Sequence, residues 1–331
     1  MKIAKLFVLA VVLFAACSKE NKNNQLETFD LNNSVSADDT AIIPLNDLGK
    51  GTFNGYQGGL YPKGINKVPS GDYATDLTKL CNNIAPIDTF GNPSSKGKIT
   101  FISLGGSTGG HLMRQLKAQT DGNPLTNPSL LLLNCDNGKR TASLNSQLNP
   151  NDPYWDHVAK ILNGGAHSSF RQVQIVYVEA DDSTKYNISF PARSLLVKAD
   201  LQACFRVYKK KFPNLKIVYI SARTRTFGNQ IPYNREPSPY YFGWGVKWAI
   251  EDQINGVPGT EYKGPRAVSP MVAWGFYQWA DSLPRKTDAF YWRQSETKDG
   301  LHATDIGEDT LATRFQNFLL TDRYAQNWYA K

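Results

Sequence analysis

Short apolar runs alternate with longer amphipathic segments over most of the chain. The clearest runs are continuous stretches of branched and aromatic residues, which indicate buried strands at 99–104, 129–135, 172–178 and 215–221, with a weaker run at 268–274. Helical segments are predicted at 73–82, 152–162, 191–212, 240–255 and 303–320. This alternation predicts an α/β fold in which helices cover both faces of a parallel sheet.

Proline, aspartate and glycine mark the ends of several predicted helices. Asp152 and Pro153 supply an N-cap and a proline at the first helical position, and Gly164 closes that helix. Pro191 precedes the longest amphipathic segment and Pro213 follows its end. These residues separate each helix from the strand that comes next.

The first strong strand leads directly into a turn of four glycines around Ser107 and Thr108, namely Gly105, Gly106, Gly109 and Gly110. The sequence from 99 to 116, ITFISLGGSTGGHLMRQL, indicates a strand, a tight turn and a helix. Such a serine lies at the ligand-binding edge of the sheet, just before helix N–H groups that can hold negative charge. We interpret Ser107 as a candidate nucleophile; the alternative is an ordinary N-cap serine in a tight connection.

Other polar residues that suggest a site also come just after predicted strands. They are Asn137 and Gly138, Asp181 and Asp182, and Arg223. The loops that follow parallel strands share one edge of the sheet, so we expect these residues to gather near Ser107.

Composition restricts the classes of function. The chain has 331 residues, 41% of them apolar, which is enough for one large core or two smaller ones. Its basic residues are spread out, so nucleic acid is not expected as a partner, whereas an acidic glycan remains open. Cys81, Cys135 and Cys204 show no metal-ligand spacing, and no nucleotide-binding loop is present, so we predict no metal and no cofactor. One disulfide could form, but Cys135 and Cys204 lie in apolar segments that favour buried thiols.

The N-terminus has the features of a secretory signal. Residues 1–16 carry two lysines and an apolar run, and Cys17 follows two alanines, which resembles the lipobox of bacterial lipoproteins. We therefore expect a signal peptide at 1–16, a lipidated Cys17, a flexible tether over 17–50 and a folded domain over 51–331. Loss of the two lysines lowers the formal net charge from +8 to +6. This interpretation places the protein in a bacterial cell envelope, anchored by lipid to the outer membrane; the alternative is a cleaved, soluble product.

One of the four histidines has a carboxylate at a useful spacing. Asp299 precedes His302 by three residues, so it can reach back to one ring nitrogen and leave the other to face a nucleophile. His111 comes one helical turn after Ser107, but the sequence offers it no obvious carboxylate. We therefore favour His302 as the base.

Ser107 after the first strong strand, with Asp299 and His302 just before the last helix, resembles the SGNH (GDSL-like) hydrolase superfamily. The stretches GGLYPKGIN, QVQIVYVEA, FPNLKIVYISAR, EPSPYYFGWGVKW and VAWGFYQWAD are similar to a little-characterised secreted subgroup. The resemblance implies a flavodoxin-like three-layer α/β/α fold over 51–328. It also implies Ser107 as nucleophile, His302 as base and Asp299 as its partner, with the N–H groups of Ser107 and Gly138 in the oxyanion hole.

The chain departs from the pattern of this family at two positions. Gly106 stands where the family has aspartate, and Asp181 stands at the position of the third-block asparagine. A charged carboxylate beside an oxyanion raises the barrier unless it is protonated or turned away, in which case Asn137 could supply the donor. Arg223 completes the residues expected around the substrate.

Two further interpretations stay open. The sequence G-x-S-x-G over 105–109 also fits the nucleophile elbow of α/β-hydrolases, although that elbow normally follows several strands.

We expect a lipid-anchored esterase or deacetylase that acts on an acylated carbohydrate or a small ester. The alternative is a glycan-binding lipoprotein without turnover, for which the carboxylate of Asp181 is the main argument. Aromatic residues concentrated over 240–292 could be core or could form a sugar-stacking wall.

Overall fold

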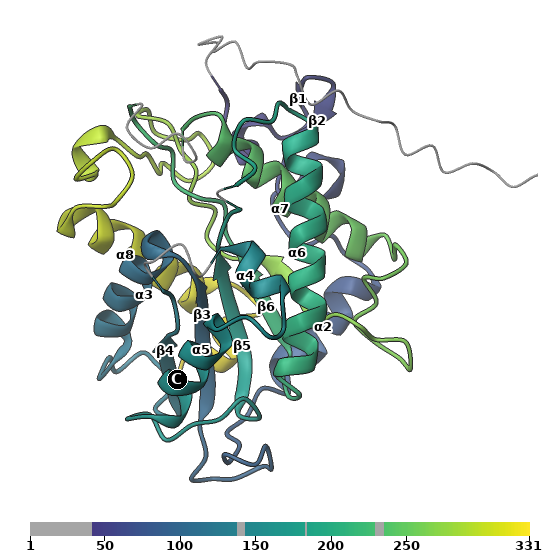
Figure 1. Ribbon diagram of the computed structural model, residues 1–331, viewed down its shortest axis with the longest axis vertical. Helices are drawn as coiled ribbons and strands as arrows, with labels where there is room; N and C mark the ends of the chain where they lie inside the picture. The colour runs from purple at the N-terminus through teal and green to yellow at the C-terminus, as the bar shows by residue number, and fades with distance from the viewer. Residues whose placement is uncertain (1–41, 138–142, 183, 229–234) are drawn as a thin grey trace, which may run out of the picture. The chain divides into compact units, whose positions relative to one another are not determined.

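The computed structural model describes residues 42–137, 143–182, 184–228 and 235–331 (Figure 1). Its main sheet has five strands, all paired in parallel, in the spatial order β4-β3-β5-β6-β7. The strands are β3 (Ile99–Gly105), β4 (Leu130–Asn134), β5 (Val173–Glu179), β6 (Ile217–Ile220) and β7 (Met271–Trp274). A small hairpin, β1 (Thr52–Phe53) with β2 (Tyr56–Gln57), lies outside this sheet.

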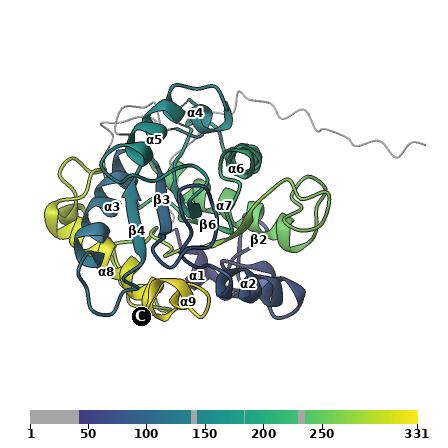
Figure 2. The same cartoon turned by 90° about the horizontal axis from the view of Figure 1, so that it is seen from below.

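Helices cover both faces of the sheet, as the alternating sequence pattern predicts. In Figure 2, α4, α5 and α6 lie on one side, and α2, α8 and α9 lie on the other. The described helices are α1 (Leu45–Leu48), α2 (Asp72–Asn82), α3 (Ser107–Thr120), α4 (Leu144–Leu148), α5 (Tyr154–Asn163), α6 (Ala192–Lys211), α7 (Ser238–Ile254), α8 (Asp305–Thr321) and α9 (Gln326–Tyr329). The described residues also form two short 3₁₀ segments, η1 (Pro62–Gly64) and η3 (Gln294–Glu296).

The sheet separates two hydrophobic cores because successive side chains of a strand point to opposite faces. In β3, Ile102 and Leu104 belong to the core under α5, α6 and α7. Phe101 belongs to the second core, which α2, α3, α8 and α9 cover. Every residue of β3 and β5 is buried, which explains why both strands are mostly apolar in the sequence.

The strand order confirms the predicted fold class. Numbered along the chain, the five strands have the order 2-1-3-4-5, which is the flavodoxin-like arrangement, with helices on both sides. The strand order reverses between β3 and β5: β4 lies on one side of β3, and β5, β6 and β7 follow on the other. Open α/β sheets bind ligands outside the carboxyl ends of the strands at this switch point, and here those ends are Gly105 and Glu179.

The folded domain begins earlier than the sequence analysis placed it. Leu45 is fully buried, and its N–H lies 3.3 Å from the hydroxyl of Tyr277. The carboxylate of Asp47 accepts hydrogen bonds from the N–H groups of Lys286 and Thr287. Residues 42–50 are therefore part of the domain, and the expected tether boundary at residue 50 is wrong.

The remaining N-terminal expectations, including Cys17 and the 1–16 signal, lie outside the described residues. In the part of the chain that the structure describes, no helix is long and apolar enough to cross a membrane. Cys81, Cys135 and Cys204 are buried free thiols.

Candidate active site

Ser107 is the first residue of α3, directly after the glycine turn that ends β3. The N-cap position belongs to Gly106, so Ser107 is not the ordinary N-cap of the alternative interpretation. The turn packs closely: a Cβ on Gly105 would meet the backbone oxygen of Glu179 and lie 2.6 Å from Oδ1 of Asp136. Only glycine fits there, and this close packing fixes the serine at the carboxyl edge of the sheet.

The structure brings together Ser107, His302 and Asp299, which lie far apart in the sequence. Oγ of Ser107 lies 2.9 Å from Nε2 of His302, and Nδ1 of His302 lies 2.7 Å from Oδ2 of Asp299. When Nδ1–H donates to the carboxylate, Nε2 of the neutral ring accepts the hydrogen bond of the serine hydroxyl. These two contacts connect Ser107, His302 and Asp299 in the relay of serine, histidine and carboxylate that the sequence predicts.

A tight turn holds Asp299 against the imidazole. Its Oδ1 accepts hydrogen bonds from the backbone N–H groups of His302, at 2.7 Å, and Leu301, at 3.0 Å. Gly300 between them has φ +84°, and a Cβ there would collide with the backbone oxygen of Phe227. Partial burial raises the pKa of Asp299, but hydrogen bonds from the ring and the backbone of His302 outweigh this and lower the pKa to about 2. Asp299 is therefore a carboxylate at any working pH.

His111 has a carboxylate partner that the sequence analysis missed. Its Nδ1 lies 3.2 Å from Oε1 of Glu308, a buried residue in the first turn of α8 that also pairs with Arg114 at 2.5 Å. Burial lowers the pKa of His111, and the charges of Arg114 and His302 act in the same direction against that of Glu308. The rings of His111 and His302 are 5.8 Å apart, so a second histidine lies beside the first.

Two acidic residues lie beneath the serine turn. Burial raises the pKa of Asp136 to about 8; a hydrogen bond from Ser103 opposes this effect and the charge of Glu179 adds to it. Burial also raises the pKa of Glu179, while Arg223 and the side chain of Thr108 favour its charged form. Burial thus favours the protonated form of both residues, and for Asp136 the charge of Glu179 adds to it.

The residues expected around the oxyanion do not all lie beside Ser107 in the described part of the chain. The N–H of Asn137 donates to the backbone oxygen of Gly105 at 3.0 Å, which places Asn137 beside the turn. Gly138 lies outside the described residues. The carboxylate of Asp181, which was expected at the oxyanion position, pairs with the fully buried guanidinium of Arg193. The acidic side chains next to the serine turn are Asp136 and Glu179, which sequence reasoning did not single out.

Arg223 lies close enough to Glu179 to favour its charge, so the loops after β3, β4, β5 and β6 do meet at one edge. In the described ranges, no group of three or more His, Cys, Asp or Glu side chains is arranged as metal ligands are.

No protein-family model matches the chain, and no curated protein matches it. Solved structures are similar at low identity. A Bacteroides fragilis protein described as an acylhydrolase has a TM-score of 0.40 and 12% identity, covering 75% of this chain and 97% of that one. An acetyl xylan esterase has a TM-score of 0.39 and 11% identity, covering 66% and 98%. A Parabacteroides merdae protein described as a GDSL-like lipase has a TM-score of 0.37 and 9% identity, covering 71% and 98%.

Proposed function

We propose that this protein is a serine ester hydrolase of the SGNH type. One observation carries the proposal: an uninterrupted relay from the Oγ of Ser107 through both ring nitrogens of His302 to the carboxylate of Asp299. The relay stands at the flavodoxin-like switch point, where the fold places its ligands. Ser107 is also the first residue of α3, whose free N–H groups can stabilise an oxyanion.

The geometry supports a two-step acyl transfer. Oγ of Ser107 attacks the ester carbonyl carbon while Nε2 of His302 takes the hydroxyl proton. The tetrahedral intermediate collapses, the C–O bond to the alcohol breaks, and His302 gives its proton to the leaving alkoxide. A water molecule then attacks the acyl-serine with His302 again as base, which releases the acid and restores the serine. Asp299 stays ionised and stabilises the imidazolium formed in each step.

We place the substrate among acylated carbohydrates, with acetyl esters first, and the protein in the cell envelope on a lipid-modified Cys17. The side chains of His302 and Asp299 are 28% and 38% exposed, which leaves the relay open to an ester on a bulky chain. The competing interpretation, a glycan-binding protein without turnover, relied on a charged Asp181 beside the oxyanion. Because Arg193 pairs with that carboxylate, the main argument for it is lost.

Labelling with a fluorophosphonate tests the proposal. We expect a single adduct on Ser107 by intact mass and peptide mapping, no adduct in Ser107→Ala, and a strongly slowed reaction in His302→Ala. Ser70→Ala, at an exposed serine, is the control and should label like the wild type. An adduct at another residue, undiminished labelling of His302→Ala, or no adduct on a folded protein would overturn the assignment. Release of acetate from acetylated xylo-oligosaccharides then tests the substrate class.

A further inference from the structure

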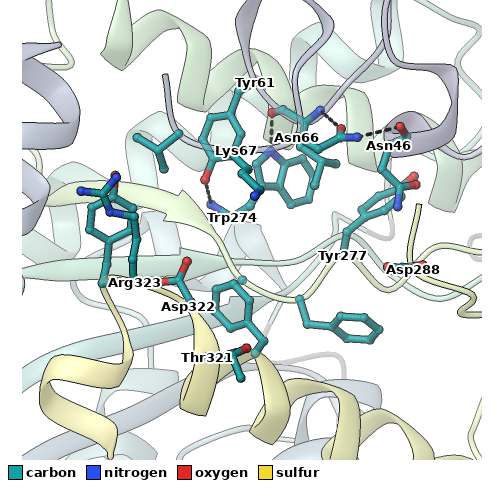
Figure 3. A pocket seen from close by; sticks show the side chains of 16 residues that line it. Asn46, Tyr61, Asn66, Lys67, Trp274, Tyr277, Asp288, Thr321, Asp322 and Arg323 are labelled. Atoms are coloured by element: carbon teal, nitrogen blue, oxygen red, sulfur yellow. Dashed lines mark hydrogen bonds between the residues drawn. The ribbon is translucent and has the colours of Figure 1, made fainter. Parts of the chain in front are cut away.

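Most of the aromatic residues of the C-terminal half are core. Tyr240, Trp244, Trp279 and Trp292 are fully buried, so they form no wall beside Ser107. Trp274 and Phe276 instead line a separate cavity of about 470 Å³ next to the edge strand β7 (Figure 3). This volume lies within the range of about 300–1,000 Å³ that is typical of small-molecule sites.

The cavity is distinct from the Ser107 site. None of its lining residues belongs to the relay, and α8 contributes Phe318 and Thr321, from its C-terminal end. His302 lies just before the other end of this helix. The two ends of a 17-residue helix are about 24 Å apart at 1.5 Å per residue. A ligand in the cavity would therefore bind away from the reacting ester.

Two buried polar side chains on the wall of the cavity lack hydrogen-bond partners for one of their atoms. Asn46 is 6% exposed and Tyr324 is 3% exposed, yet the Oδ1 of Asn46 and the hydroxyl of Tyr324 make no hydrogen bond within the described part of the chain. An unpaired buried polar atom costs about 1–3 kcal/mol. Both atoms are themselves buried, so the wall of the cavity would have to shift before a ligand could pair with either of them.

Charged groups of both signs also line the cavity. The ammonium of Lys67 has no carboxylate partner among the described residues. Asp322 uses Oδ1 to accept the N–H groups of Tyr324 and Ala325, and its Oδ2 has no hydrogen bond there. The other lining carboxylate, Asp288, is fully engaged by Arg285. Arg323 also lines the cavity, and its charge favours the ionised form of Asp322. The lining therefore offers both donors and acceptors.

We propose that this cavity binds a saccharide unit of a glycan chain, independently of the hydrolytic site. A sugar ring presents hydroxyl groups that both donate and accept hydrogen bonds, which matches the Oδ2 of Asp322 and the ammonium of Lys67. Its C–H face packs on apolar aromatic surface, which the partly exposed rings of Phe276 and Phe318 supply. A purely apolar ligand would leave these polar groups unpaired, and a strongly charged one would meet a like charge.

Calorimetric titration of the full chain with cello-, xylo-, chito- and galacturono-oligosaccharides, and with their monosaccharides, tests this proposal. We expect at least one series to bind, and Ser107→Ala to bind it equally well. Asp322→Asn should weaken binding about tenfold and Lys67→Ala about three- to tenfold, because each removes a charged hydrogen-bond partner. Lys50→Ala, an exposed lysine outside the cavity, is the matched control and should bind like the wild type.

The outcomes separate this proposal from the hydrolase assignment. Binding that is lost in Ser107→Ala, or that is unchanged in both Asp322→Asn and Lys67→Ala, would overturn the cavity as the site. Absence of binding by every saccharide would overturn its chemical class. Failure of fluorophosphonate labelling together with intact saccharide binding would instead overturn the hydrolase alone. Comparing monosaccharides with oligosaccharides distinguishes a free sugar from a glycan chain as the occupant.

Discussion

Replacing Asp136 by asparagine should remove a pH-dependent destabilisation of the domain. In the folded protein the pKa of Asp136 is about 8, whereas its ordinary value is 3.8. An acid whose pKa is raised by folding holds its proton more tightly in the folded state. Stability is therefore lost as the pH rises from about 4 to about 8, and no further loss comes from this group above pH 8.

The structure sets the size of the effect. A difference of about four pKa units, at about 1.4 kcal/mol per unit, gives an upper limit of between 5 and 6 kcal/mol, by the linkage of pKa to stability. Asp136 is only half-buried, and solvent screens part of its charge, so we expect about 2–3 kcal/mol. Asp136→Asn keeps the oxygen that accepts from Ser103 and removes the repulsion with Glu179.

Urea unfolding followed by tryptophan fluorescence at pH 4.5, 6, 7 and 8 measures this difference. The free energy of unfolding of Asp136→Asn should be close to that of the wild type at pH 4.5 and about 2–3 kcal/mol higher at pH 8. Titrating groups that do not interact with Asp136 cancel in the comparison. Asp156→Asn, at an exposed carboxylate of α5, is the control and should follow the wild-type curve. Parallel curves for Asp136→Asn and the wild type across this range would refute the reasoning.

Three other perturbations follow from the site. Asp299→Asn should lower kcat by about 10³–10⁴ with little change in KM, because the imidazolium loses its carboxylate; steady-state kinetics would contradict this with a loss below about tenfold. Gly105→Ala should destabilise the domain by about 1–3 kcal/mol, while Gly106→Ala, whose Cβ would meet nothing within 4 Å, should be neutral; equal thermal midpoints would exclude the packing argument. Glu308→Gln should lower the pKa of His111, because the ring loses the negative charge that favours its protonation; an NMR titration showing a higher pKa would contradict the pairing.

Because Asp181 pairs with Arg193, the variant Asp181→Asn tests the stability of the domain as well as the oxyanion site. Asp181→Asn would leave the charge of Arg193 buried without its carboxylate, and breaking such a pair costs about 3–5 kcal/mol. A loss of activity in this variant would therefore report on folding and not on the oxyanion. Asp181→Asn with Arg193→Met removes both charges and separates the two effects.

The sequence by itself determined the alternating elements and the two local parts of the relay, whereas the contact between Ser107 and His302 joins residues 195 positions apart and comes from the tertiary structure. Parallel strands buried on both faces are mostly apolar, so β3 and β5 are visible as apolar segments in the sequence. The glycine turn before Ser107 and the Asp299-x-x-His302 spacing are local features, because each depends on residues within one turn of backbone. Local patterns of this kind can be interpreted without knowing which segments pack together.

The tertiary structure alone decided which distant charges meet. Asp181 pairs with Arg193 because α6 packs beside the loop after β5, and Glu308 reaches His111 because α8 packs along α3. Burial raises the pKa of Glu179, although the sequence presents it as one of several acids after a strand. These interactions depend on distances below about 4 Å and on exclusion of water, and neither is encoded in spacing along the chain.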